Sequence, residues 1–302
     1  MNVFITGGTG FVGRNLTAGL IERGHAVTIL TRHGKKRRLH PAVSFVAGDP
    51  NHKGAWQERL QGHDAVINLA GASIFCRWNK KNKKILMESR LRTTENIVDG
   101  IASLHNRPAI LLNASGIGYY GRNCEEETTE TAVAGDDFLA RLASAWEESA
   151  QKAEKLGVRV VLCRFGAVLG KDGGAMQRML TTFRLGLGSP LGTGSQWFPW
   201  IHIKDLVNGM LFLLEHQKTA DPVNFTAPQT ITNREMSQAL GKALKKPVFL
   251  PPVPGFVLKL LLGPVSQIVL YGQKAIPKKL LDNGYTFSFP TIDEAFADLV
   301  EE

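Results

Sequence analysis

Tyrosine and cysteine are scarce in this chain, and their spacing excludes two kinds of site. Only four tyrosines occur in 302 residues, and none has a lysine four positions later. A tyrosine and a lysine with that spacing lie on one helix face and can share a proton transfer, so this device is absent. Cys76, Cys124 and Cys163 have neither metal-ligand spacing nor a disulfide pattern. We therefore expect no metal site and a reducing compartment, the cytoplasm.

Long uninterrupted apolar runs are also missing. The most apolar late stretch, PGFVLKLLLGPVSQIVLYG, is broken by Lys259, Pro264 and Gln267, which makes it a poor membrane span. The amino-terminal MNVFITGG enters a strand-like run without the basic and apolar regions of a secretory signal. The sequence thus predicts neither a membrane segment nor secretion.

The positive charge does not indicate a nucleic-acid protein. The formal net charge is +9, and basic residues gather at 32–38 and 79–84. A nucleic-acid surface would interleave such groups with aromatic side chains or place them on a recognised reading module, and neither is found. Hydrophobic content of 43% and charged content of 21% are ordinary for a globular protein. The expected partners are a small-molecule substrate and a second copy in a homodimer.

What the chain does have is a glycine loop between a strand and a helix. The pattern predicts a strand at 3–6, a helix at about 11–23 and a second strand at 26–31. Glycines at positions 7, 10 and 13 fall in the loop and the first helical turn. In this setting they permit close approach of a pyrophosphate to the backbone and to the helix N-terminus. A dinucleotide-binding unit is therefore predicted.

The end of the second strand indicates which dinucleotide binds. An NAD site places a carboxylate there for the ribose hydroxyls, but this chain has Thr31 and Arg32, with Lys35 soon after. A guanidinium binds two oxygens of a 2′-phosphate at once. We expect NADP(H), with Arg32 as the main contact and Lys35 or Arg37 assisting.

Further apolar runs extend the fold. Strands are expected at 43–49, 64–73, 108–116 and 158–170, with helices at about 79–103 and 137–156. Apolar strands that alternate with helices form a doubly wound parallel sheet of Rossmann type, α/β in class. We expect an NADP(H)-binding domain over 1–224, with a substrate-loop segment at about 170–200, and a small, mostly helical C-terminal cap over 225–302.

Four motifs carry a family resemblance. TGGTGFVG, NLAGAS, the serine-to-YYG segment NASGIGYYG and WIHIKD together resemble the extended short-chain dehydrogenase/reductases. Within that NAD(P)-dependent epimerase/dehydratase superfamily, segments 77–94 and 183–192 and the C-terminal tail resemble the atypical, YfcH-like group. Its members are called epimerase family proteins, without a proven reaction.

The resemblance implies roles for individual residues. It implies that the residues at the cofactor are Thr6, Gly7, Gly10, Phe11, Val12, Gly13, Leu69, Ala70 and Gly71, and, near the nicotinamide, Arg164. It gives His202 and Asp205 a supporting role at the pocket edge.

The resemblance also predicts which catalytic residues are present and which are missing. Ser115 corresponds to the serine that hydrogen-bonds the substrate oxygen in active relatives, whereas their Tyr-x-x-x-Lys pair has no counterpart here. Tyr119, Tyr120 or water remain as proton sources, although Tyr120 is better suited to packing of the glycine-rich loop than to catalysis. Glu147 is a further acid or base, although a glutamate in mid-helix is usually solvated. We take Ser115 and Tyr119 as the catalytic candidates.

The substrate side is less regular. Segment 170–200 ends in a glycine-rich loop with aromatic residues, which suits a mobile lid or a core-packing loop. Arg77, Arg184 and Lys204 are candidate cations for an anionic substrate, and Trp200 is a candidate contact.

The resulting functional expectation is an oxidoreductase that uses NADP(H) on an unknown small molecule. An epimerase or dehydratase with tightly held NADP is one alternative. A non-catalytic NADPH-responsive binding protein is another, and the missing tyrosine–lysine pair favours it.

Overall fold

The structure, a computed structural model, describes residues 1–32, 40–122, 124–216 and 219–301. Its centre is a seven-stranded, wholly parallel sheet with the order β10-β7-β5-β4-β1-β2-β3. The sheet strands are β1 Asn2–Thr6, β2 Ala26–Thr31, β3 Val43–Ala47, β4 Ala65–Asn68, β5 Ile110–Gly116, β7 Arg159–Phe165 and β10 Asp221–Phe225. The doubly wound α/β expectation is confirmed.

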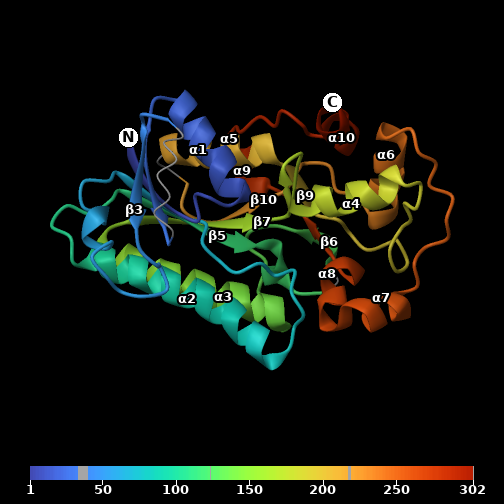
Figure 1. Cartoon of the computed structure of the whole chain (residues 1–302), viewed down its shortest axis with the longest axis horizontal. Coiled ribbons are helices and arrows are strands. Elements are labelled where there is room, and N and C mark those ends of the chain that lie inside the picture. The colour runs from blue at the N-terminus through green and yellow to red at the C-terminus, as the bar shows by residue number, and fades with distance from the viewer. Residues whose placement is uncertain (33–39, 123, 217–218, 302) are drawn as a thin grey trace.

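Helices cover both faces of this sheet (Figure 1). One face carries α1 (Phe11–Glu22) and α5 (Ile203–Glu215), and the other carries α2 (Lys80–Ala102) and α3 (Phe138–Gln151). The central strands read as continuous apolar runs because both of their faces are buried: every residue of β4 is buried. Leu16 and Leu20 pack on one face, and Ile97 and Ala150 pack on the other.

Two details of the sheet differ from the expectation. The run at 158–170 forms two strands, β7 and β8 (Ala167–Gly170), which are separated at Gly166. A Cβ at Gly166 would lie 2.8 Å from the carbonyl oxygen of Pro199, so the chain bends there against another backbone. The seventh strand, β10, is an addition at the sheet edge, where it pairs with β7.

The remaining elements form a smaller region beside the sheet. Its helices α4, α6 and α10 pack around a separate apolar cluster, and β8 pairs with β9. These elements are β6 Cys124–Thr128, α4 Gly174–Arg184, β9 Trp200–His202, α6 Asn233–Ala243, α7 Gly255–Leu262, α8 Gln267–Leu270, β11 Gln273–Ala275, α9 Lys278–Asp282 and α10 Ile292–Val300. Single 3-10 turns lie at Glu58–Leu60, Ile117–Tyr120, Lys152–Leu156 and Gly263–Ser266. Within the described residues, no helix combines the length and apolarity needed to cross a bilayer. The division at residue 224 stays a prediction.

The C-terminal segments are tied to the sheet by buried polar groups. Asn224 of β10 donates its side-chain amide to the carbonyl of Ile276, 3.0 Å away. The carboxylate of Asp205, at the start of α5, accepts the backbone N–H groups of Ser288 and Phe289 at 2.7 and 2.9 Å. Burial raises the pKa of Asp205, and these backbone donors partly offset that shift. Asp205 therefore fastens the tail to α5, which packs on the sheet, and this agrees with a supporting role.

Candidate functional site

The glycine loop after β1 forms a cradle that side chains would fill. Gly7 has a φ of +74°, and a Cβ there would lie 2.6 Å from the carbonyl carbon of Leu69. A Cβ at Gly13 would lie 2.3 Å from the carbonyl oxygen of Gly7. The loop thus lies directly against the Leu69–Ala70 backbone that follows β4. Because two backbones meet at the C-terminal ends of neighbouring strands, this edge fits the phosphates of a dinucleotide.

The start of α1 reinforces this cradle. Gly10 is its N-cap, no side chain caps the helix, and its first turn has no acidic residue. The first N–H groups of such a helix carry a partial positive charge that suits an anion. Phe11 turns away from the loop, because Cβ atoms at Gly170 and Gly173 would each lie 2.6 Å from its ring. The ring therefore supports the start of the predicted substrate loop, and the half-buried Val12 packs against the core.

Thr6 uses its side chain inside the sheet. It is fully buried, and its hydroxyl donates to the side-chain Oδ1 of Asn68 over 2.6 Å. The Asn68 amide in turn donates to Asn113 at 2.7 Å. These bonds join β1, β4 and β5 just below the edge, so the hydroxyl of Thr6 is committed to the fold. The predicted cofactor contact of Thr6 therefore does not come from its hydroxyl.

The predicted 2′-phosphate site lies at the end of β2. Thr31 is the last residue of that strand and is half-buried, while Arg32 follows it with an exposed side chain. Arg32 is therefore free to approach a ligand that lies over the neighbouring glycine loop. Lys35 and Arg37 lie outside the described residues.

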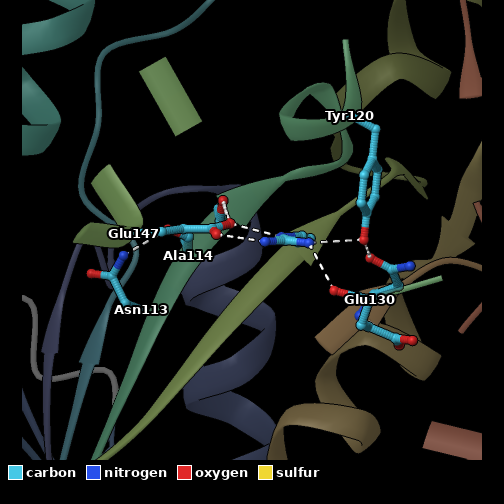
Figure 2. Close-up of polar contacts among 8 residues, drawn as sticks. Asn113, Ala114, Tyr120, Glu130 and Glu147 are labelled. Carbon is cyan, nitrogen blue, oxygen red and sulfur yellow. Dashed lines mark hydrogen bonds and ion pairs between the residues drawn. The ribbon is translucent and has the colours of Figure 1, made fainter. Parts of the chain in front are cut away.

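Ser115 lies near the end of β5, at the same sheet edge. Its hydroxyl donates to Oε1 of Glu147 over 2.6 Å, and Glu147 reaches it from α3. Arg164 hydrogen-bonds both Glu147 and Tyr120, which Figure 2 shows on opposite sides of the polar network. Arg164 of β7 donates through Nε to Oε1 and through Nη2 to Oε2 of Glu147, at 2.8 and 2.7 Å. The carboxylate is thereby fixed in one orientation, and Ser115 with it.

The guanidinium of Arg164 is enclosed by the two tyrosines. Its Cζ lies 3.4 Å from the Tyr119 ring centre, and its Nη1 donates to the Tyr120 hydroxyl at 3.0 Å. That hydroxyl donates to Asn224 at 2.7 Å. Burial would lower the pKa of Arg164, but hydrogen bonds and attraction from Glu147 outweigh it and raise the pKa. Burial also raises the pKa of Tyr120 to about 12, against the effect of Arg164, so Tyr120 stays protonated at neutral pH.

This network revises several expectations. Glu147 is 4% exposed and not solvated. Arg164, expected at the nicotinamide, is 2% exposed and directs its side chain to Glu147 and the tyrosines. Tyr120 is a structural link, as loop packing predicted. Tyr119 is half-buried and lies flat against Arg164, which leaves its catalytic role a prediction.

The buried carboxylate of Glu130 was not anticipated. Its Oε1 accepts the backbone N–H groups of Asn224 and Lys279, each at 3.1 Å. Glu130 ends the acidic segment EEETTE, yet it is only 5% exposed. Its partners lie 94 and 149 residues away in the chain, so no local pattern could reveal it.

The substrate candidates do not gather around Ser115. Arg77 and Arg184 are exposed, and no contact within the described residues joins either to the network. Lys204 pairs with Asp298 at 2.6 Å. Trp200 is 1% exposed within the apolar cluster of α4, α6 and α10. This position matches the alternative in which the loop packs into the core. In this conformation Trp200 cannot contact a ligand.

Among the described residues, no group of acidic, histidine or cysteine side chains has a metal-binding arrangement.

The chain resembles known proteins over its whole length. The NAD dependent epimerase/dehydratase family matches residues 3–225, and a domain of unknown function, DUF1731, matches residues 253–299. The chloroplastic epimerase family protein SDR39U1 homologue of Arabidopsis thaliana is 40% identical, over 100% of this chain and 87% of the relative. An epimerase family protein of Staphylococcus haemolyticus is 37% identical over 98% of each chain.

A solved structure agrees with these sequence relatives. The human epimerase family protein SDR39U1, whose crystal structure was determined with NADPH, is 36% identical and has a TM-score of 0.87 over 99% of both chains. The glycine cradle, the parallel sheet and these full-length matches lead to one conclusion: this chain belongs to the NAD dependent epimerase/dehydratase family and is similar to its SDR39U1-type members.

Proposed function

We propose that this protein is an NADP(H)-dependent oxidoreductase acting on a small molecule. The observation that carries the proposal is the position of Ser115 on β5, at the sheet edge that also carries the glycine cradle. Its hydroxyl is held there by Glu147 of α3, whose Oε1 lies 2.6 Å away. A bound nicotinamide cofactor supplies hydride transfer. The chain's own residues then have to hold the substrate and move a proton.

NADP(H) is favoured over NAD(H) by the charge at the end of β2. Arg32 is exposed there, in the place where an NAD site has a carboxylate. The similar human protein was crystallised with NADPH, which supports the same choice. Gly7 and Gly13 would hold the pyrophosphate, because their lack of side chains keeps the cradle open.

The proton is handled by Ser115 with Glu147 behind it. Because the Ser115 hydroxyl donates to the carboxylate, its oxygen lone pairs remain to accept a hydrogen bond from a substrate hydroxyl or amine. When hydride is lost from such a substrate, its proton would pass to Ser115 Oγ while the serine proton passes to Glu147 Oε1. In reduction, Glu147 would first take up a proton from solvent, and the two proton transfers would then run in reverse. Arg164 keeps this carboxylate in position.

The test offers the protein NADPH with a panel of carbonyl, quinone and alkene acceptors. Consumption of NADPH is monitored through the absorbance of the reduced nicotinamide. Wild type should turn over at least one acceptor class, and Ser115→Ala should slow turnover by about 100-fold or more while NADPH still binds. Thr131→Ala, which removes the hydroxyl of an exposed loop residue, serves as the control. Absence of turnover with every acceptor, despite NADPH binding, would overturn the proposal.

A non-catalytic NADPH-responsive binding protein is the second candidate. The observation that favours it is that Arg164 bonds both Tyr120 and Glu147, in a chain that lacks the tyrosine–lysine pair. Such a protein would change oligomeric state or partner with NADPH and show no turnover. An epimerase or dehydratase would instead purify with NADP bound and consume none.

A further inference from the structure

Arg90 of α2 is a cation enclosed by uncharged groups. Its Nη1 donates to the carbonyl of Leu86, one turn earlier, at 3.2 Å. Its Cζ lies 5.1 Å from the ring centre of Trp146 on α3. The guanidinium also lies close to Gly71, where an added Cβ would be 3.2 Å from Cζ. The guanidinium is thus near Gly71 as well as near side chains and backbone of α2 and α3.

No described carboxylate lies within ion-pair distance of Arg90. Its neighbour Arg92, by contrast, pairs with Glu88 at 2.9 Å. Burial lowers the pKa of Arg90 to about 10, which still leaves it charged at neutral pH. A half-buried charge without a counter-ion destabilises the fold. A cation that costs stability in this way is typical of a site that an anionic ligand completes.

The place of Arg90 relates this charge to the proposed cofactor site. Gly71 follows Leu69 and Ala70, the backbone that meets Gly7 of the glycine loop, and Gly71 is itself exposed. The segment is anchored to α2 because Ala72 N–H donates to Ser89 Oγ at 3.1 Å. Arg90 therefore lies beside the exposed continuation of the cradle, at the end of β4.

A second link leads from Arg90 towards Ser115. Trp146, whose ring lies against Arg90, directly precedes Glu147 on α3 and donates its indole N–H to Thr94 at 2.9 Å. On the sheet, β4 is the neighbour of β5, with Asn68 opposite Asn113 and Ser115 two residues further along. A ligand that extends from the glycine loop towards Ser115 must cross the β4 end, where Arg90 lies.

We propose that Arg90 is an oxyanion-binding residue, which holds a phosphate or carboxylate group of the ligand bound over the ends of β4 and β5. The inference rests on the proposed dinucleotide site. Two sources share this chemistry, namely the diphosphate of the cofactor and an anionic group of the substrate. The planar guanidinium can bind two oxygens of either group at once.

The test compares Arg90→Met and Arg90→Lys with a matched control. Arg92→Met removes the same side chain two residues away, from an exposed arginine that pairs with Glu88. Thermal unfolding is measured first: Arg90→Met should be as stable as wild type or more stable, since an uncompensated charge is removed. Arg90→Lys keeps the charge and loses the two-point geometry. The binding measurements use this variant if Arg90→Met fails to fold.

Binding is then measured by tryptophan fluorescence with three probes. NADPH and 2′-phospho-ADP-ribose both contain the diphosphate, whereas adenosine 2′,5′-bisphosphate lacks it. If Arg90 holds the cofactor diphosphate, Arg90→Met weakens the first two by roughly 10- to 100-fold and leaves the third unchanged. If it holds the substrate, all three bind as in wild type, and calorimetry with NADPH-saturated protein shows inorganic phosphate binding that Arg90→Met abolishes.

The proposal is overturned if Arg90→Met and Arg92→Met behave alike with all three probes and with phosphate. It is also overturned if Arg90→Met unfolds far below wild type and Arg90→Lys retains full binding, because the role is then structural. Failure of the proposed function looks different: wild type itself would bind no NADPH or turn over no acceptor.

Discussion

The Arg164 guanidinium and the Glu147 carboxylate form a buried two-point ion pair, with side chains 3% and 5% exposed. The same carboxylate accepts the Ser115 hydroxyl. A change at Glu147 therefore affects both the stability of the fold and the orientation of the proposed proton-transfer group.

Glu147→Gln should lower the free energy of unfolding by about 3–5 kcal/mol, because it leaves the buried charge of Arg164 without compensation. Urea unfolding measures this. Glu88→Gln is the control, since its pair with Arg92 is exposed and is worth only about 1 kcal/mol or less.

Adding Arg164→Met to Glu147→Gln should recover part of the loss, since the unpaired charge is removed with its partner. A double variant as unstable as the sum of the two single variants would show that the pair is not coupled in the way its geometry indicates.

Gly7→Ala should weaken NADPH binding by more than about tenfold, because the added methyl group collides with the Leu69 backbone and pushes the cradle apart. Gly24→Ala is matched in backbone strain, with a φ of +76° and no atom within 4 Å of the added carbon. It should cost about 1 kcal/mol of stability and leave NADPH binding intact. Fluorescence titration compares the two, and equal binding by both would contradict the cradle.

Arg32→Ala should reduce affinity for NADPH by roughly 10- to 100-fold while affinity for NADH changes little, because a two-point, charge-assisted contact with the 2′-phosphate is lost. Arg59→Ala, another exposed arginine, controls for net charge. An equal decrease for both cofactors would place the 2′-phosphate elsewhere.

The stability of the fold should depend on pH because His202 is buried in its neutral form. Burial lowers its pKa to about 4; nearby Asp298 acts in the opposite direction, and Lys204 and Lys171 add to the lowering. The unfolded chain, with an ordinary histidine pKa near 6.5, binds the proton more readily. Stability is therefore fully present above about pH 6.5 and falls as the pH drops towards 4, by about 3 kcal/mol in total.

His202→Asn isolates this effect. The Nδ1 of His202 caps α5 by accepting the Lys204 N–H at 3.1 Å, and asparagine can cap a helix without titrating. Urea unfolding at a series of pH values should give a shallower acid slope for the variant. The same slope in both proteins would assign the acid sensitivity to other groups.

The parallel sheet was predictable because its central strands are apolar on both faces. The strand expected at 26–31 coincides with β2, and the helix expected at 79–103 corresponds to α2. The edge strand β10 was not predicted from the sequence because it is short and contains polar residues. It begins with Asp221, whose φ is +68°, and contains Pro222. Such a strand pairs on one side alone and needs no apolar run.

The site was predictable where one local segment builds it and not where distant segments meet. Gly7 and Gly13 act within one loop, so their spacing was sufficient. The partners of Glu147 lie 17 and 32 residues away, and its burial depends on how α3 lies over β5 and β7. Trp200 was predicted as a substrate contact, yet it is buried in the apolar cluster. An aromatic residue in a glycine-rich loop gives the same sequence pattern whether it faces a ligand or the core.

The ties from Asp205 and Glu130 to the tail have a consequence for synthesis of the chain. The sheet is complete once β10 has been made, yet Asp205 still lacks the N–H donors of residues 288 and 289, and Glu130 that of Lys279. Until these residues leave the ribosome, two carboxylates stay hydrated and the β10 side of the Arg164 network stays open. A nascent chain should thus acquire its sheet before it acquires a competent site.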